Sequence, residues 1–321
     1  MTEKERFIKA LKHEPITGHV PHFELVFYLT MEVLGKVHPE HRNMSQWKQM
    51  SPREKELQLQ DAAGCFIDIA RKYNHSAIFV HPSVNDFDSV RRLLEIIRER
   101  TDDGFFLMMH GDPTYSIPGG EDILEFSAQI YEEPEQLHEK AKIATDKCLE
   151  NAQQFAKTGL LDGFCLCSDY CFNTNPFLSP DMFGELVAPY LKRVIAGYRD
   201  MGFYSIKHTD GNIMPIIEQI LDCKPDALHS LDPQAGVDLR LVKERYGKRV
   251  CLIGNVNCGL LQTGTDEQVR QDVLRSLRDG MPGYGYIFST SNCVYTGLQL
   301  ERYELIHSIW REHGVYSRKG D

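Results

Sequence analysis

The chain has 321 residues, of which 42% are hydrophobic, and a formal net charge of −10. This length and composition allow one large core, so we predict a single domain over residues 1–321, in the size range of an α/β barrel. The negative charge disfavours non-specific binding to nucleic acid and to anionic lipid. We therefore expect a small-molecule substrate or a protein partner, and no nucleic acid or membrane partner.

The first residues, MTEKERFIKALKHE, are charged from the third position and lack the apolar stretch of a signal peptide. No long uncharged apolar run occurs later in the chain, so we predict a cytoplasmic protein without a membrane span. The nine cysteines are odd in number and irregularly spaced, which favours free thiols over a disulfide framework. Cys165, Cys167 and Cys171 are interpreted as packing residues.

Thr2 and Glu5 have the spacing of a capping box, and apolar residues follow at helical intervals, which predicts a helix before the first strand. Eight short apolar runs then alternate with helix-like segments. The alternation favours a (β/α)8 TIM barrel with an N-terminal helical extension. The predicted strands cover residues 20–25, 76–80, 105–110, 163–169, 204–208, 227–232, 250–255 and 286–290.

Helical patterns cover residues 90–100, 134–155 and 239–246. Ser179 and Pro180 have the pattern of a helix start, and Pro189 is expected to interrupt that helix, which predicts two short helices. Residues 82–103 and 112–122 are candidate insertions over the barrel mouth, because long loops with Pro and Gly often cover a site.

Catalytic groups of such barrels lie at the carboxyl ends of the strands, where this sequence is rich in polar residues. For a single residue, a cap to a loop or helix is an equally good explanation, but the whole set together predicts a metal or acid/base site. The set comprises Glu24, His81, His110, Asp169, His208, Asp210, Asp232, Asn255, Asn257, Asn292 and Cys293.

His208, Asp210 and Cys293 form the strongest candidate metal site. His208 and Asp210 are two positions apart, so their side chains lie on one face if the strand continues. Nitrogen, oxygen and sulfur ligands suit Zn2+ with an open fourth position. The alternatives are a hydrogen-bonded His–Asp pair and a small buried cysteine.

Four segments resemble the uroporphyrinogen decarboxylase superfamily in order and spacing, and the opening ERFIKALKHEPITGHVPHFEL is similar to its N-terminus. The resemblance implies the same barrel fold. The four segments are SDYCFNTNPFLSPDMFGELVAPYLKRVI, HTDGNI, GNVNCGLLQTGTDEQV and NCVYTGLQLERY.

Within the superfamily, the decarboxylase itself has an Arg-rich stretch after the first strand that pairs with substrate carboxylates, whereas FELVFYLTMEVLGK here contains no Arg. The chain is more similar to the cobalamin-dependent methyltransferases, in which a His-x-Cys pair and a distal Cys bind zinc. His208 and Cys293 align with the His and the distal Cys, while Asp210 replaces the middle Cys. A carboxylate donates less electron density than a thiolate, so the resemblance favours methyl-ether O-demethylation over thiol methylation.

The resemblance thus implies zinc-assisted transfer of a methyl group from a methyl ether, most simply a methoxylated aromatic, to the cobalt of a partner corrinoid protein. His208, Asp210 and Cys293 would bind zinc, and Glu24, Asp169 and His208 are the predicted catalytic groups. The predicted substrate-binding residues are Phe27, Tyr28, His110, Tyr170, Asn255 and Tyr295. His110, Tyr170 and Asn255 would orient the substrate together with Asp169, and an apolar slot around the ring would be formed by Phe27, Tyr28, Phe172 and Tyr295.

Core packing explains these aromatics equally well. Two other functions stay open: a metal-independent decarboxylase or lyase acting on a different acid, and a non-catalytic binding protein on a barrel scaffold. The sequence leaves the oligomeric state open, with a homodimer as one alternative.

Overall fold

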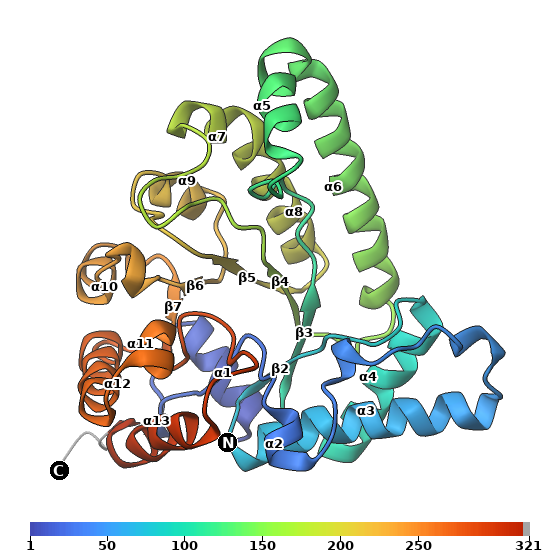
Figure 1. The fold of residues 1–321 in the computed structure, drawn as a ribbon, viewed down its shortest axis with the longest axis vertical. Helices are drawn as coiled ribbons and strands as arrows, with labels where there is room; N and C mark the ends of the chain where they lie inside the picture. Colours follow the sequence, from blue (N-terminus) through green and yellow to red (C-terminus); the bar gives the residue numbers. More distant parts are fainter. Residues whose placement is uncertain (317–321) are drawn as a thin grey trace.

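The computed structural model describes residues 1–316, and its centre is a curved parallel sheet of seven strands in the order β2-β3-β4-β5-β6-β7-β8 (Figure 1). Seven of the eight predicted strands are therefore confirmed, and several of them are shorter than predicted at their carboxyl ends. Their bounds are β2 Ala77–Phe79, β3 Phe106–His110, β4 Gly163–Leu166, β5 Tyr204–Thr209, β6 Ala227–Ser230, β7 Cys251–Ile253 and β8 Tyr286–Ile287.

The predicted first strand over residues 20–25 is reduced to a single-residue bridge. His22 forms parallel bridges to His75, just before β2, and to Phe288, just after β8. This segment therefore connects the two edges of the sheet. Below it, β1 (Gly18–His19) pairs antiparallel with β9 (Val315–Tyr316) in a separate two-stranded sheet. The fold is TIM-barrel-like, with seven regular strands rather than eight.

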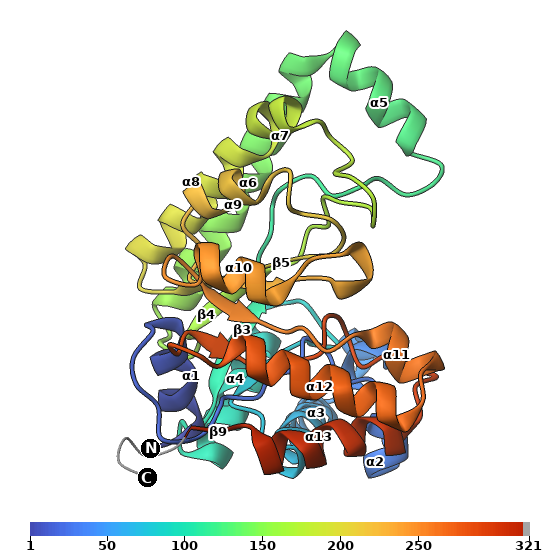
Figure 2. The same cartoon turned by 90° about the vertical axis from the view of Figure 1, so that its left-hand side faces the viewer.

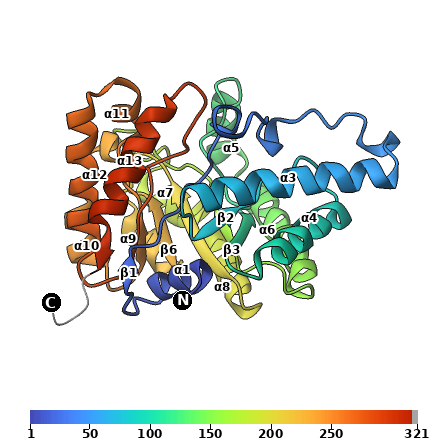
Figure 3. The ribbon, with the colours of Figure 1, turned by 90° about the horizontal axis from the view of Figure 1, so that it is seen from below.

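Most helices lie on the outer side of the sheet (Figures 1 and 3). The N-terminal helix instead packs against the inner core, where Phe7 contacts Phe23 and Phe106. The N-terminal helix and its capping box are confirmed: Glu5 N donates to Thr2 Oγ1 over 3.1 Å, and Thr2 N donates to Glu5 Oε2 over 2.8 Å. The helices are α1 Glu3–Leu11, α2 Thr30–Leu34, α3 Pro52–Lys72, α4 Phe87–Thr101, α5 Ile123–Glu132, α6 Pro134–Ala156, α7 Pro180–Leu186, α8 Ala188–Asp200, α9 Ile217–Asp222, α10 Leu239–Tyr246, α11 Cys258–Thr263, α12 Asp266–Gly280 and α13 Leu300–His313.

The two short helices predicted after Ser179 are α7 and α8, but the prediction for residues 82–103 was wrong. Most of that segment is α4, which packs against α3 in the outer layer because its apolar face is buried. The second candidate insertion leads into α5, which extends away from the sheet (Figure 2). None of the residues of α5 is buried. No helix within residues 1–316 is both long enough and apolar enough to cross a membrane.

Alternation along the strands separates two cores. Ile206 belongs to an inner cluster with Phe23, Phe106 and Met108, and two residues further along β5 the side chain of His208 shares that inward face. The intervening Lys207 points to the outer layer, between sheet and helices. At the carboxyl end of β5, the imidazole of His208 thus lies on the inner face of the sheet and the ammonium group of Lys207 on its outer face.

Candidate functional site

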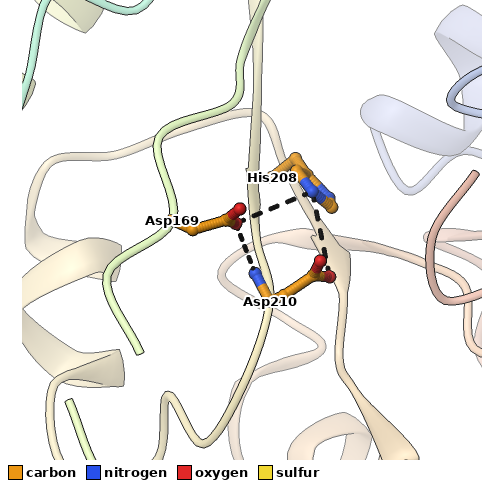
Figure 4. A group of neighbouring side chains, drawn as sticks. All are labelled: Asp169, His208 and Asp210. Atoms are coloured by element: carbon orange, nitrogen blue, oxygen red, sulfur yellow. Dashed lines mark hydrogen bonds and ion pairs between the residues drawn. The ribbon is translucent and has the colours of Figure 1, made fainter. Parts of the chain in front are cut away.

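Asp169, His208 and Asp210 come together at the carboxyl ends of two neighbouring strands (Figure 4). His208 lies in β5, Asp210 directly follows that strand, and Asp169 lies in the loop after β4. His208 Nε2 is 3.9 Å from Asp169 Oδ1 and 3.8 Å from Asp210 Oδ1. One ligand atom from each residue lies within 4.8 Å of the others. The predicted partnership of His208 and Asp210 therefore holds in space, with Asp169 as the third member.

Hydrogen bonds fix the two carboxylates. The backbone N–H of Asp210 donates to Asp169 Oδ1 over 2.9 Å, which is possible because β4 and β5 are adjacent. Asp210 also accepts from Ser230 Oγ over 2.7 Å and from Asn292 Nδ2. Each oxygen of Asp210 has a donor, so the carboxylate has one orientation, facing His208.

The electrostatics of this group favour a cation. Burial, followed by the nearby carboxylate of Asp169, raises the pKa of Asp210 to about 7. Burial lowers the pKa of His208 to about 4, so its imidazole is neutral and retains an unprotonated ring nitrogen at neutral pH. Two carboxylates and a neutral imidazole face one point. A cation bound at that point would be stabilised by all three groups.

The geometry also fits one metal ion. Two ligand atoms that are each about 2 Å from a common ion cannot be more than about 4 Å apart, and both distances from His208 Nε2 satisfy this limit. One nitrogen and two oxygen donors suit zinc, and they equally suit harder divalent ions. The three residues present therefore fit a bound divalent metal.

Cys293, the third predicted metal ligand, lies outside this group of ligand atoms, although it follows Asn292, which holds Asp210. Burial raises the pKa of its thiol to about 12. Glu24 is 4% exposed, and its Oε2 accepts from Ser289 Oγ and the backbone N–H of Thr290. Glu24 thus supports the loop after β8 from inside the molecule and is not part of the ligand group.

Three of the predicted substrate-binding residues are buried, and their side chains contact other residues of the protein. Phe27 packs against the rings of Tyr73 and Tyr303, which also contact each other. Tyr170 is buried with its hydroxyl 2.6 Å from Thr114 Oγ1. Asn255 is fully buried and donates to the backbone oxygen of Leu231.

The other three are more accessible. Tyr28 stacks on His41 and donates to Glu40 over 2.7 Å. Tyr295 donates to Gln262, and His110 is exposed at the end of β3. A small cavity next to Asp169 is lined mainly by aromatic side chains: Tyr115, Phe126, Tyr170, Phe177 and Phe183.

The sequence reasoning missed His229 and the pair Lys207–Asp112. His229 pairs in register with His208 on the neighbouring strand, so the two imidazoles lie on the same face, with 2.7 Å between their Nδ1 atoms. Aligning the HTDG and HSLD segments at their strand ends would have revealed this pair. The contact of Lys207 with Asp112 joins segments that are far apart in the sequence, so no local sequence pattern predicts it.

The family model described as uroporphyrinogen decarboxylase (URO-D) matches residues 110–313. This is more than half of the chain, and the chain belongs to this family. It is 25% identical over 202 residues to the uroporphyrinogen decarboxylase of Shewanella pealeana (strain ATCC 700345 / ANG-SQ1), covering 59% of this chain and 52% of that protein. It is 26% identical over 194 residues to the enzyme of the same name from Pseudoalteromonas translucida (strain TAC 125), covering 56% and 50%. The chain spans about half the length of these curated relatives.

Among solved structures, a methyltransferase from Methanosarcina mazei is similar over 97% of this chain and 99% of its own, with a TM-score of 0.73 and 17% identity. This similarity establishes a shared fold over the whole length. The superfamily suggested by the sequence is confirmed by the family match over residues 110–313.

Proposed function

We propose that the protein is a methyltransferase that moves a methyl group from a methyl ether, such as a methoxylated aromatic, to the cobalt of a corrinoid carried by a separate protein. The observation that carries the proposal is the convergence of Asp169, His208 and Asp210 on one point at the carboxyl ends of β4 and β5. These three residues would hold a divalent metal, for which zinc is our choice. Such an ion, when bound, supplies Lewis acidity that stabilises negative charge on a leaving oxygen.

The chain's own residues contribute orientation and shape. Ser230 and Asn292 hold Asp210, and Asp210's backbone N–H holds Asp169, so the ligands are arranged before any ion arrives. The cavity beside Asp169 has room for about one water molecule, so a methoxylated aromatic would bind with its ring outside this cavity, in front of the three ligand residues. Tyr28 and His110, two of the three more accessible members of the predicted set, would contact substituents of that ring.

Carboxylate-rich surroundings argue against decarboxylation of a polyacid. Asp169, Asp210 and Asp232 follow neighbouring strands, and each would repel a substrate carboxylate. The nearest buried cation, Lys207, is already paired with Asp112. We therefore favour methyl transfer. The experiment must separate it from the alternative, the metal-independent decarboxylase reaction.

The test is metal content by mass spectrometry on protein purified without chelator, followed by methyl transfer from methoxylated aromatics to a corrinoid acceptor. We expect about one metal per chain, in line with one three-residue ligand group. His208→Ala should lose the metal and turnover together. Wild-type protein that binds no metal when zinc is offered would contradict the proposal.

Two conservative variants identify the third ligand. Asp169→Asn should lose metal if Asp169 completes the site as the geometry suggests. Cys293→Ser should lose it if the thiol completes the site, as the resemblance implies. Each variant is the control of the other, since both change one possible ligand without altering its size greatly.

A further inference from the structure

A line of buried polar side chains runs from His208 into the core of the molecule. His208 Nδ1 is 2.7 Å from Nδ1 of His229, whose Nε2 is 3.3 Å from Ser289 Oγ, which in turn is 3.3 Å from Glu24 Oε2. His208 and Glu24 are each 4% exposed, and His229 and Ser289 are fully buried. Water is therefore not available as a substitute partner, and each contact must be satisfied within the line.

We propose that Glu24, Ser289 and His229 are positioning residues that fix the tautomer and orientation of His208, so that its Nε2 faces Asp169 and Asp210 without a proton. The inference rests on the proposed function, because it gives a role to the side of His208 that the metal would not occupy. It concerns the state of the imidazole before any metal binds.

The direction of hydrogen-bond donation along this line of side chains can be assigned starting from Glu24. Glu24 Oε2 accepts the backbone N–H of Thr290 over 3.1 Å, so this oxygen is an acceptor. The hydroxyl of Ser289 must then donate to Glu24 and can accept only from the other side. That side is Nε2 of His229, which therefore carries the proton of its ring.

The same reasoning continues to His208. His229 is fully buried, and the contacts described for its ring nitrogens are to His208 and Ser289, neither of which is a carboxylate. A charged imidazole would be unpaired there, so the ring carries one N–H. With that proton on Nε2, its Nδ1 accepts. The proton between the two rings, 2.7 Å apart, thus belongs to Nδ1 of His208. The remaining nitrogen of His208, Nε2, has a free electron pair that points toward the two carboxylates.

Metal-binding histidines commonly donate their second ring nitrogen to a carboxylate or carbonyl, and loss of such a partner weakens metal binding roughly 10- to 100-fold. In this protein the link to the carboxylate passes through a second imidazole and a hydroxyl. The parallel register of His208 and His229 makes this link possible, since both side chains project from the same level of the sheet.

The first test is a measurement on the wild-type protein, and a variant serves only to assign its signals. NMR of the metal-free wild-type protein with nitrogen-15-labelled histidine reports which ring nitrogen of each neutral imidazole is protonated. We expect the Nδ1–H tautomer for His208 and the Nε2–H tautomer for His229, with the signals assigned through His229→Asn. An Nε2–H tautomer at His208 would overturn the inference.

The second test is the affinity for zinc, measured by competition with a coloured chelator. His229→Leu removes the acceptor and should weaken binding about 10- to 100-fold. His229→Asn places a carbonyl oxygen near the position of Nδ1 and should bind within a few-fold of wild type. Equal affinity for the leucine variant and wild type would overturn the inference. Absence of zinc binding by wild type would instead overturn the proposed function, while the tautomers would still be measured.

Discussion

The ammonium nitrogen of Lys207 lies 2.8 Å from Asp112 Oδ2, and both side chains are completely buried. The same nitrogen donates to the backbone oxygen of Ser168 over 2.9 Å and lies 4.0 Å from the centre of the Tyr170 ring. Ser168 N donates to Asp112 Oδ2 as well. The pair thereby joins β5 to the loops after β3 and β4, and the second of these loops carries Asp169.

Replacing one member of this pair should leave an uncompensated buried charge. We predict that Lys207→Met lowers the free energy of unfolding by about 3–5 kcal/mol, measured by urea denaturation. The double variant Lys207→Met with Asp112→Leu should recover most of the loss, because both charges are then absent. A double variant as unstable as the single one would show that packing, and not charge, dominates.

Exchanging a carboxylate for a thiolate separates metal binding from ether cleavage. We predict that Asp210→Cys keeps the metal, because a thiolate is a good zinc ligand, but lowers the demethylation rate about tenfold through weaker Lewis acidity. Metal content and turnover are measured on the same preparation. Asp232→Asn, which changes a neighbouring carboxylate outside the ligand group, is the control. Faster demethylation by Asp210→Cys would contradict our account of the carboxylate.

Neutral histidines buried beneath the sheet should make the fold sensitive to acid. Burial, with His22 nearby, lowers the pKa of His307 to about 4 and holds that of His75 well below its usual value. The unfolded chain therefore binds protons first, and stability that is complete above about pH 6.5 falls as the pH drops toward 4.

The pH effect can be assigned by removing one of these groups. Urea denaturation at about pH 7.5 and about pH 5.5 should show a clear loss of stability for wild type and a loss smaller by about 1 kcal/mol for His307→Gln. An identical pH dependence in the two proteins would mean that His307 does not titrate on unfolding.

The helix α5 should be the first part of the protein to be cut by chymotrypsin. It has no buried residue, and Leu124 and Tyr131 are both 79% exposed. Few apolar contacts oppose its local opening, so cleavage within residues 123–132 should precede cleavage of the sheet and produce two large fragments. Mass spectrometry identifies the cut. Resistance of this helix to the protease would show that it is covered in solution.

Much of the fold could be predicted from the sequence because strand and helix periods are local properties. The capping box at Thr2, the paired helices after Ser179 and seven strands are confirmed. The segment around His22 was the exception: its apolar run predicts a strand, but only one residue forms bridges. A local pattern does not reveal how many backbone groups will find partners.

The candidate site, too, could be predicted only in part from the sequence. Strand ends located His208, Asp210 and Asp169 correctly at one rim, since parallel strands end on the same side. Their choice as a ligand group, with Cys293 outside it, depends on distances between loops that no spacing encodes. Burial of Phe27 and Tyr170 likewise follows from tertiary packing.

The pairing of β1 with β9, together with the bridges of His22 to both sheet edges, has a consequence for synthesis on the ribosome. Residues 18–22 emerge early, yet most of their bridge partners lie beyond β8. The strands from β2 onward can pair in order as they appear, while the early segment waits for almost the whole chain. The bridge of His22 to His75 can form early, so the edge at β2 can be covered at once. Until the residues after β8 have been made, the open edge lies at the most recently formed strand, where another strand could pair wrongly.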